Sequence, residues 1–148
     1  MLEQLITSFI AAAAFVIIFN APRRTLLQCG LVGMISWFVY FMLVDRYDAL
    51  AASLAATFIV GIVCQAFARL YKMPVIIFSV AGIIPLVPGG MAYDAMRNFV
   101  EHDYNNAMEL AAEAMMISGS IAVGLVLSEV LNQMIRRAGI RTQSGTKS

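Results

Sequence analysis

The segment best suited to bind a small polar molecule begins with two prolines and two glycines and continues with polar side chains. Its members are Pro85, Pro88, Gly89, Gly90, Tyr93, Asp94 and Arg97. A helix that restarts after the glycines presents unpaired backbone N–H groups with partial positive charge, which suit a carboxylate. Asp94 and Arg97 lie three residues apart on such a helix, where they can pair with each other or bind an ammonium group and a carboxylate. Together with the hydroxyl of Tyr93, this pattern favours a site for a small carboxylate or an amino acid.

Each of these polar residues also has a simpler interpretation. Tyr93, Asp94 and Arg97 can decorate an external helix at the membrane surface, where tyrosine prefers headgroup depth. A further carboxylate, Glu113, lies about one turn inside the last apolar segment. A charge there is costly unless it faces a cavity or a partner, so Glu113 is a candidate for the substrate pathway or for proton transfer. The alternative is an interfacial carboxylate that reaches headgroup water.

Catalysis, cofactors and nucleic acid have little support. His102 is the single histidine, and it lies in a polar run without a second set of metal ligands. No phosphate-binding glycine loop occurs, so we expect neither ATP nor a dinucleotide to bind. A net charge of +1 gives no polybasic surface for nucleic acid. We therefore expect a protein that is not an enzyme and has no metal site and no cofactor.

The elements that position these residues are membrane helices. Hydrophobic residues make up 61% of the 148 residues and charged residues only 13%, about half the share in soluble domains. Five apolar segments can be drawn, at about 4–20, 26–44, 49–69, 74–88 and 109–132. We predict an all-α polytopic membrane protein, with a transmembrane helical domain over residues 1–135 and a basic cytoplasmic tail over 136–148.

The fourth segment is too short for an ordinary span. The stretch from Pro74 to Pro88 gives only about 22 Å of helix, whereas the hydrocarbon core is about 30 Å thick. It can continue past the Pro-Gly break to Val100, as the discontinuous helices of transporters do. It can also be a short span that stops at a glycine and is followed by an external loop.

The basic residues sort to one side of this arrangement. Eight of the ten follow the first, third and fifth segments, namely Arg23, Arg24, Arg69, Lys72, Arg136, Arg137, Arg141 and Lys147. Because positive residues concentrate in the cytoplasm, we expect the N-terminus outside and the C-terminus inside. The protein is predicted to lie in the bacterial inner membrane.

Small residues at intervals of four predict how the helices pack. Lipid does not drive helices together, so close approach of small side chains must do so. The third segment carries Ser53, Thr57, Gly61 and Gln65, and the fifth carries Ser120, Gly124 and Ser128. We expect these faces to form a tight bundle, and we expect Glu129 to pair with Arg136 or Arg137.

The order of these motifs resembles that of the small membrane subunit of the bacterial threonine/serine exporter family. Asn20-Ala21-Pro22-Arg23 after the first segment is similar to that family's Asn-x-Pro-x-Arg turn, and Pro74 opens the fourth segment. The stretch from Pro85 to Gly89, followed by Tyr93, resembles the family's Pro-x-x-Pro-Gly-x-x-x-Tyr pattern. Gly90 departs from it, since an aliphatic residue is more usual there. The resemblance covers nearly the whole chain.

The resemblance implies a subunit that works with a larger membrane subunit of the same family. It further implies secondary export of threonine and serine, or of a small dicarboxylate such as succinate, coupled to the proton gradient. Membrane lipid is an expected partner, and a homo-oligomer is a further arrangement that the sequence allows. The competing hypothesis is a membrane scaffold that stabilises a partner transporter without contacting substrate.

Overall fold

The computed structural model describes the backbone of residues 2–144 and the side chains of residues 2–136. Within that part the chain forms helices only, which confirms the predicted all-α class. The elements are α1 (Leu2–Ile18), the short 3₁₀ helix η1 (Arg23–Thr25), α2 (Leu26–Val44), α3 (Ala49–Tyr71), α4 (Val75–Ile83), the 3₁₀ helix η2 (Ile84–Leu86), α5 (Gly89–Val100) and α6 (Tyr104–Ser144).

Three helices end on a residue with a left-handed backbone. Asn20, Lys72 and His102 have φ values of 51°, 53° and 65° and close α1, α3 and α5. In each case the next N–H donates to a carbonyl five residues back, such as Met73 to Ala68 at 3.1 Å. This is the hydrogen bond of a Schellman ending, which turns the chain sharply and satisfies a terminal carbonyl. The short links between the helices follow from these endings.

The helices differ in their ability to cross a membrane. Three are long and apolar enough to do so, formed by residues 23–44, 49–71 and 104–136. The pair formed by residues 75–86 and 89–100 adds a fourth if it is counted as one bent span. The first predicted segment forms α1, an apolar helix of 17 residues at the lower end of spanning lengths. All five apolar segments are helical, and the chain is a multi-pass membrane protein.

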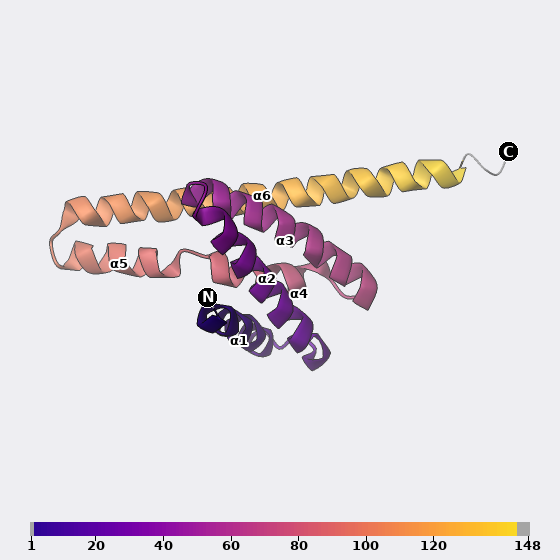
Figure 1. Cartoon of the computed structure of the whole chain (residues 1–148), viewed down its shortest axis with the longest axis horizontal. Coiled ribbons are helices and arrows are strands. Elements are labelled where there is room, and N and C mark those ends of the chain that lie inside the picture. Colours follow the sequence, from indigo (N-terminus) through magenta and orange to yellow (C-terminus); the bar gives the residue numbers. More distant parts are fainter. Residues whose placement is uncertain (1, 145–148) are drawn as a thin grey trace.

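The helices form a bundle with a projecting arm. Helices α1 to α4 pack on one another, and α3 also packs along α6. Helix α5 packs on the N-terminal half of α6, and this pair extends well beyond the α2–α3 turn (Figure 1). The bundle core contains Ala12, Val32, Cys64 and Phe78, all without exposed surface.

The helix α6 runs through the predicted boundary at residue 135. It continues to Ser144, so the stretch from 136 is not set apart from the last span by a break in the helix. Residues 145–148 of the predicted tail lie outside the described residues.

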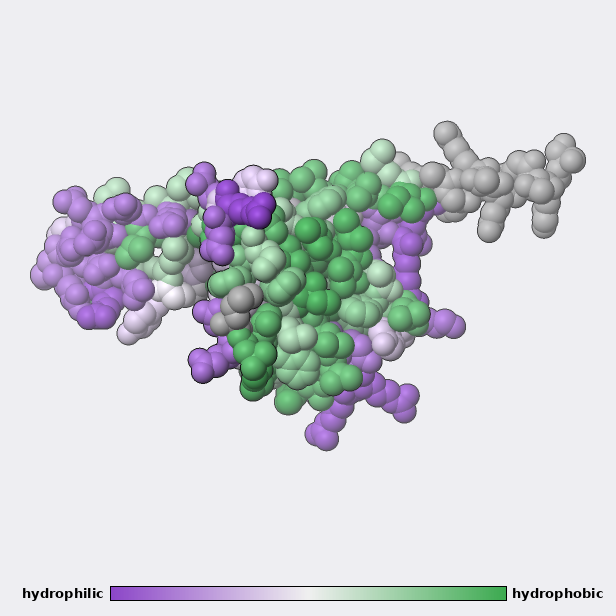
Figure 2. Space-filling model, viewed as in Figure 1, coloured by the Kyte–Doolittle hydropathy of each residue, from purple (hydrophilic) through white to green (hydrophobic). Residues whose placement is uncertain are grey.

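The surface is divided along the molecule. Hydrophobic residues cover the middle, whereas hydrophilic residues gather at the end of the α5–α6 arm (Figure 2). Many large apolar side chains of the bundle are exposed, among them Ile10, Ile17 and Ile76. A surface of this kind suits contact with lipid, since such patches are rare on soluble monomers.

Candidate functional site

The break after the fourth segment lies at Val87 and Pro88. Proline disfavours a helical conformation in the preceding residue, and Val87 is extended, with φ −63° and ψ 126°. Pro85 lies within η2, three residues before Pro88. The helices on either side of the break are bent by 50°. Helix α5 begins directly after Pro88. The fourth segment is therefore not followed by the external loop that the sequence allows as an alternative.

The glycines lie inside the new helix, which corrects the expectation that it restarts after them. Helix α5 begins at Gly89 with Pro88 as its N-terminal cap, and both glycines belong to its first turn. No glycine of the described residues has a positive φ. A Cβ added at Gly89 or Gly90 meets nothing within 4 Å. Neither glycine is therefore required by the backbone or by contacts within this chain.

The start of α5 offers backbone donors. The N–H of Ala92 bonds to the carbonyl of Pro88 at 3.1 Å, and that of Gly89 bonds to Val87 at 2.7 Å. No side chain caps this helix start. Within residues 2–136, the N–H groups of Gly90 and Met91 donate no hydrogen bond to another element. These donors suit a carboxylate, as the sequence predicts.

The polar residues of α5 point away from the neighbouring helix. Ala95 is buried against α6, whereas Tyr93, Asp94 and Arg97 are exposed on the other faces. Arg97 pairs with Glu101, with 2.9 Å between Nε and Oε1, rather than with Asp94. Tyr93 and Arg97 line an open cavity of about 300 Å³ together with Glu101, and Asp94 lies outside it.

Glu113 lies elsewhere on the arm. It is half-buried on α6, one residue before Ala114, whose carbonyl accepts a hydrogen bond from Ser118 at 2.8 Å. Glu113 does not line the groove between α5 and α6, and neither do Asp94 and Arg97. The predicted pathway residues therefore remain dispersed in the chain taken alone.

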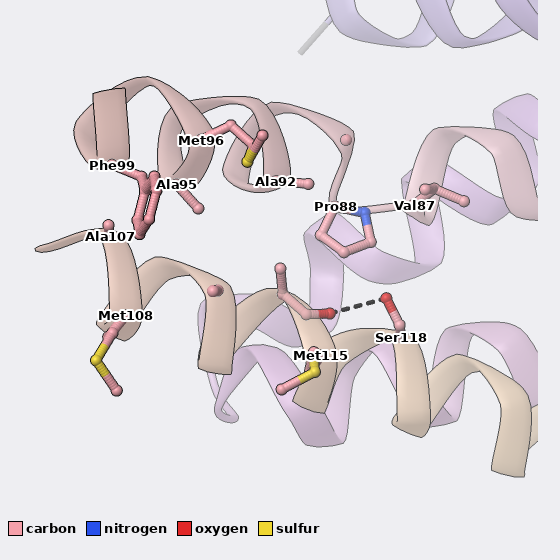
Figure 3. A pocket seen from close by; sticks show the side chains of 13 residues that line it. Val87, Pro88, Ala92, Ala95, Met96, Phe99, Ala107, Met108, Met115 and Ser118 are labelled. Atoms are coloured by element: carbon pink, nitrogen blue, oxygen red, sulfur yellow. Dashed lines mark hydrogen bonds between the residues drawn. The ribbon is translucent and has the colours of Figure 1, made fainter. Parts of the chain in front are cut away.

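The groove between α5 and α6 has a volume of about 650 Å³ and is apolar (Figure 3). Phe99 reaches towards Ala107, and its ring meets that of Tyr104 edge-on with centroids 5.3 Å apart. The lining residues are Val87, Pro88, Gly89, Ala92, Ala95, Met96, Phe99, Ala107, Met108, Ala111, Ala114, Met115 and Ser118. Such a lining suits an apolar occupant rather than a charged metabolite.

The small-residue faces meet where α3 crosses α6. Ser53, Thr57, Gly61 and Gln65 are all buried, as are Gly124 and Ser128. Ser120 is only half-buried, and its hydroxyl donates to the carbonyl of Met116 within its own helix. Side chains join the two helices as well, since Gln65 Nε2 donates to the carbonyl of Ser128 at 3.1 Å.

Glu129 does not form the predicted pair with Arg136. Its carboxylate instead accepts hydrogen bonds from Gln65 at 3.3 Å and from Gln133 at 3.4 Å. Arg137 lies beyond the described side chains. Gln65 is buried at the crossing of α3 and α6. Its hydrogen bond holds the Glu129 carboxylate on the side that faces α3.

A further cavity, which sequence reasoning missed, lies at the opposite end of the molecule from the arm's tip. It has a volume of about 450 Å³ and is lined by Gln65, Ala68, Arg69, Met73, Val75, Asn132 and Arg136. The signal was available, because Gln65 and Arg69 are four residues apart, as are Asn132 and Arg136. Each pair therefore shares a helix face.

A bundle of apolar helices with an interrupted segment defines a multi-pass α-helical membrane protein. Comparison with known families agrees, since residues 4–131 match the family described as "Threonine/Serine exporter, ThrE". The chain belongs to the threonine/serine exporter family, which confirms the resemblance seen in the sequence.

A curated relative gives the scale of the match. The chain is similar to a threonine/serine exporter of Corynebacterium glutamicum, with 27% identity over 134 residues. The match covers 90% of this chain but only 27% of that relative. The chain thus spans about a quarter of the relative's length. No solved structure matches the chain significantly.

Proposed function

We propose that this chain is a subunit of a secondary transporter that exports small amino acids of the threonine and serine type. The observation that carries the proposal is the family match over residues 4–131, which includes nearly all the apolar helices. The broken segment at Pro88 supports it, because interrupted helices supply backbone donors at transporter binding sites. A small dicarboxylate such as succinate is the other substrate class that fits these donors.

A partner is part of the proposal. The matched region covers only 27% of the relative from Corynebacterium glutamicum. We propose that the partner is a larger membrane subunit of the same family. The exposed apolar groove between α5 and α6 and the dispersed pathway residues both favour a site that is completed by another chain.

The orientation follows from charge. The bacterial inner membrane, with the N-terminus outside and the C-terminus inside, agrees with the arginines that follow α1 and with those in the C-terminal parts of α3 and α6. In this frame the tip of the α5–α6 arm lies on the external side. Export coupled to the proton gradient is the energy source that we propose.

A scaffold without substrate contact is the second candidate. The exposure of Tyr93, Asp94 and Arg97 favours it, since none of them lines a shared cavity with Glu113 in this chain. It predicts that substitutions at these four positions matter only when they lower the abundance of the partner.

The test is efflux of labelled threonine, serine and succinate from loaded cells. The chain is expressed alone and with the neighbouring large subunit, and insertion of both is measured. We expect efflux of threonine and serine only when both are present. A stable complex that exports none of the three would overturn the transport proposal in favour of the scaffold.

Leucine at Gly89 or Gly90 sharpens this test. Because the space beside both residues is empty in this chain, neither variant is expected to disturb its folding. We expect normal insertion and at least a tenfold loss of export, about 1.4 kcal/mol, because the larger side chains fill space needed by the substrate or the partner.

Gly119→Leu is the matched control, since an added Cβ at Gly119 in α6 also meets nothing within 4 Å. Normal export by both Gly89→Leu and Gly90→Leu would show that the start of α5 is structural only.

A further inference from the structure

The cavity lined by Arg69 and Arg136 combines positive charge with hydrogen-bonding amides. It lies where the last turns of α3 pass α6, next to the start of α4. Gln65 and Asn132 supply the amides, and Gln65 is only 6% exposed. A volume of about 450 Å³ falls within the range of small-ligand sites.

The two guanidinium groups have no carboxylate of their own. The one ion pair among the side chains of residues 2–136 joins Arg97 and Glu101, at the far end of the molecule. Arg69 Nη2 instead donates to the neutral amide oxygen of Asn132. This hydrogen bond holds the guanidinium beside the cavity and leaves its charge uncompensated.

A carboxylate lies one hydrogen bond away from the amide of Gln65, outside the cavity lining. Glu129 accepts from Gln65 Nε2 at 3.3 Å, while the same nitrogen also donates to the carbonyl of Ser128. The cavity wall itself is therefore cationic at Arg69 and Arg136 and amide at Gln65, whereas Glu129 is exposed and does not line it. Two arginines next to neutral amides match the carboxylate of a free amino acid, and an amide oxygen can accept a hydrogen bond from its ammonium group.

We propose that this cavity binds the zwitterion of a small amino acid, with its carboxylate between Arg69 and Arg136 and its ammonium group towards the amide of Gln65. The inference rests on the proposed export function and adds the site at which substrate first binds. Arginine is suited to this role because its planar fork binds a carboxylate in a bidentate manner. Positive residues mark this end as cytoplasmic, which is the side from which an exported substrate arrives.

Binding of labelled threonine to the purified full chain in lipid nanodiscs tests the site. We expect Arg69→Gln and Arg136→Gln each to weaken binding about tenfold to a hundredfold, which corresponds to the loss of one charge-assisted contact. Threonine methyl ester, which lacks the carboxylate charge, should not compete.

Arg24→Gln is the control, because Arg24 is an exposed arginine on the same side but outside the cavity. Thermal unfolding of each variant shows whether a loss reflects misfolding. Absence of threonine binding by the unaltered chain, or equal binding by the arginine variants, would overturn the proposal.

An anionic lipid headgroup is the competing occupant, since its phosphate shares the chemistry of a carboxylate. Nanodiscs of phosphatidylcholine alone and of phosphatidylcholine with phosphatidylglycerol distinguish the two. Threonine binding that persists without anionic lipid supports the amino-acid site. Arginine-dependent binding of phosphatidylglycerol without threonine binding would overturn it.

Efflux measurements separate this inference from the proposed function. If cells export threonine and the double variant Arg69→Gln with Arg136→Gln exports it with an unchanged concentration dependence, the site fails and the function stands. If the unaltered pair of subunits exports nothing while the purified chain binds threonine, the function fails and the site stands.

Discussion

The glycines of residues 2–136 fall into two kinds according to what lies beside them. A Cβ at Gly61 would approach Ser128, with 2.6 Å to its Cβ, and a Cβ at Gly124 would lie 2.8 Å from the carbonyl oxygen of Leu54. Both distances are far below contact, so the α3–α6 crossing depends on the absence of a side chain at each position. The space beside Gly119, in contrast, is open.

Gly124→Leu is expected to destabilise the protein by about 1–3 kcal/mol, because the obstructing Leu54 and Phe58 atoms belong to the backbone of α3 and the helices must move apart. Thermal unfolding in detergent measures the loss. Gly119→Leu in the same helix is the control and should leave the melting temperature unchanged. Equal stability of the two variants would mean that the crossing is looser than the structure shows.

The bend between α4 and α5 coincides with the break in the helix at Pro88. Val87 is extended because Pro88 follows it, and these two residues separate η2 from α5. The packing of α5 along α6 holds the second helix in its direction. Proline and packing therefore both act on the 50° angle.

Pro88→Ala separates these two contributions. Alanine restores a backbone donor and permits a helical Val87, so we expect η2 and α5 to join and the bend to decrease. Spin labels on Ile76→Cys in α4 and Val100→Cys in α5, both exposed sites, should then show a longer distance. An unchanged distance distribution would show that the contact with α6 sets the angle by itself.

The distribution of charge over the whole molecule predicts its orientation. The hydrophilic end of the arm lies at one end of the apolar region (Figure 2), and the C-terminal parts of α3 and α6, which carry Arg69 and Arg136, run towards the other end (Figure 1). Positive residues remain in the cytoplasm, so the arm is expected to face outwards.

Thiol labelling tests this orientation. Cys29 and Cys64 are fully buried, so the background of the unaltered chain should be low. In right-side-out vesicles an impermeant maleimide should label Asn105→Cys at the arm and leave Tyr71→Cys at the end of α3 unlabelled. Permeabilised vesicles, in which both should react, provide the control. The reverse pattern would invert the proposed topology.

Sequence by itself determined the helical class, the five apolar segments, the broken fourth segment and the family. These properties are local: hydrophobicity, proline and glycine act within a few residues of chain. The intervals of four residues also indicated that Gly61 and Gly124 each lie on a packing face. They did not predict which atoms each glycine approaches.

Only the tertiary structure decided which polar residues share a site. Asp94 and Arg97 are close in sequence, but both are exposed because Ala95 is the residue of this turn that packs inwards. Arg97 forms its ion pair with Glu101. Arg69 and Arg136 are far apart in sequence, and the α3–α6 crossing brings both to one cavity. Contacts between distant helices depend on the crossing point and rotation of each helix, which periodicity alone does not fix.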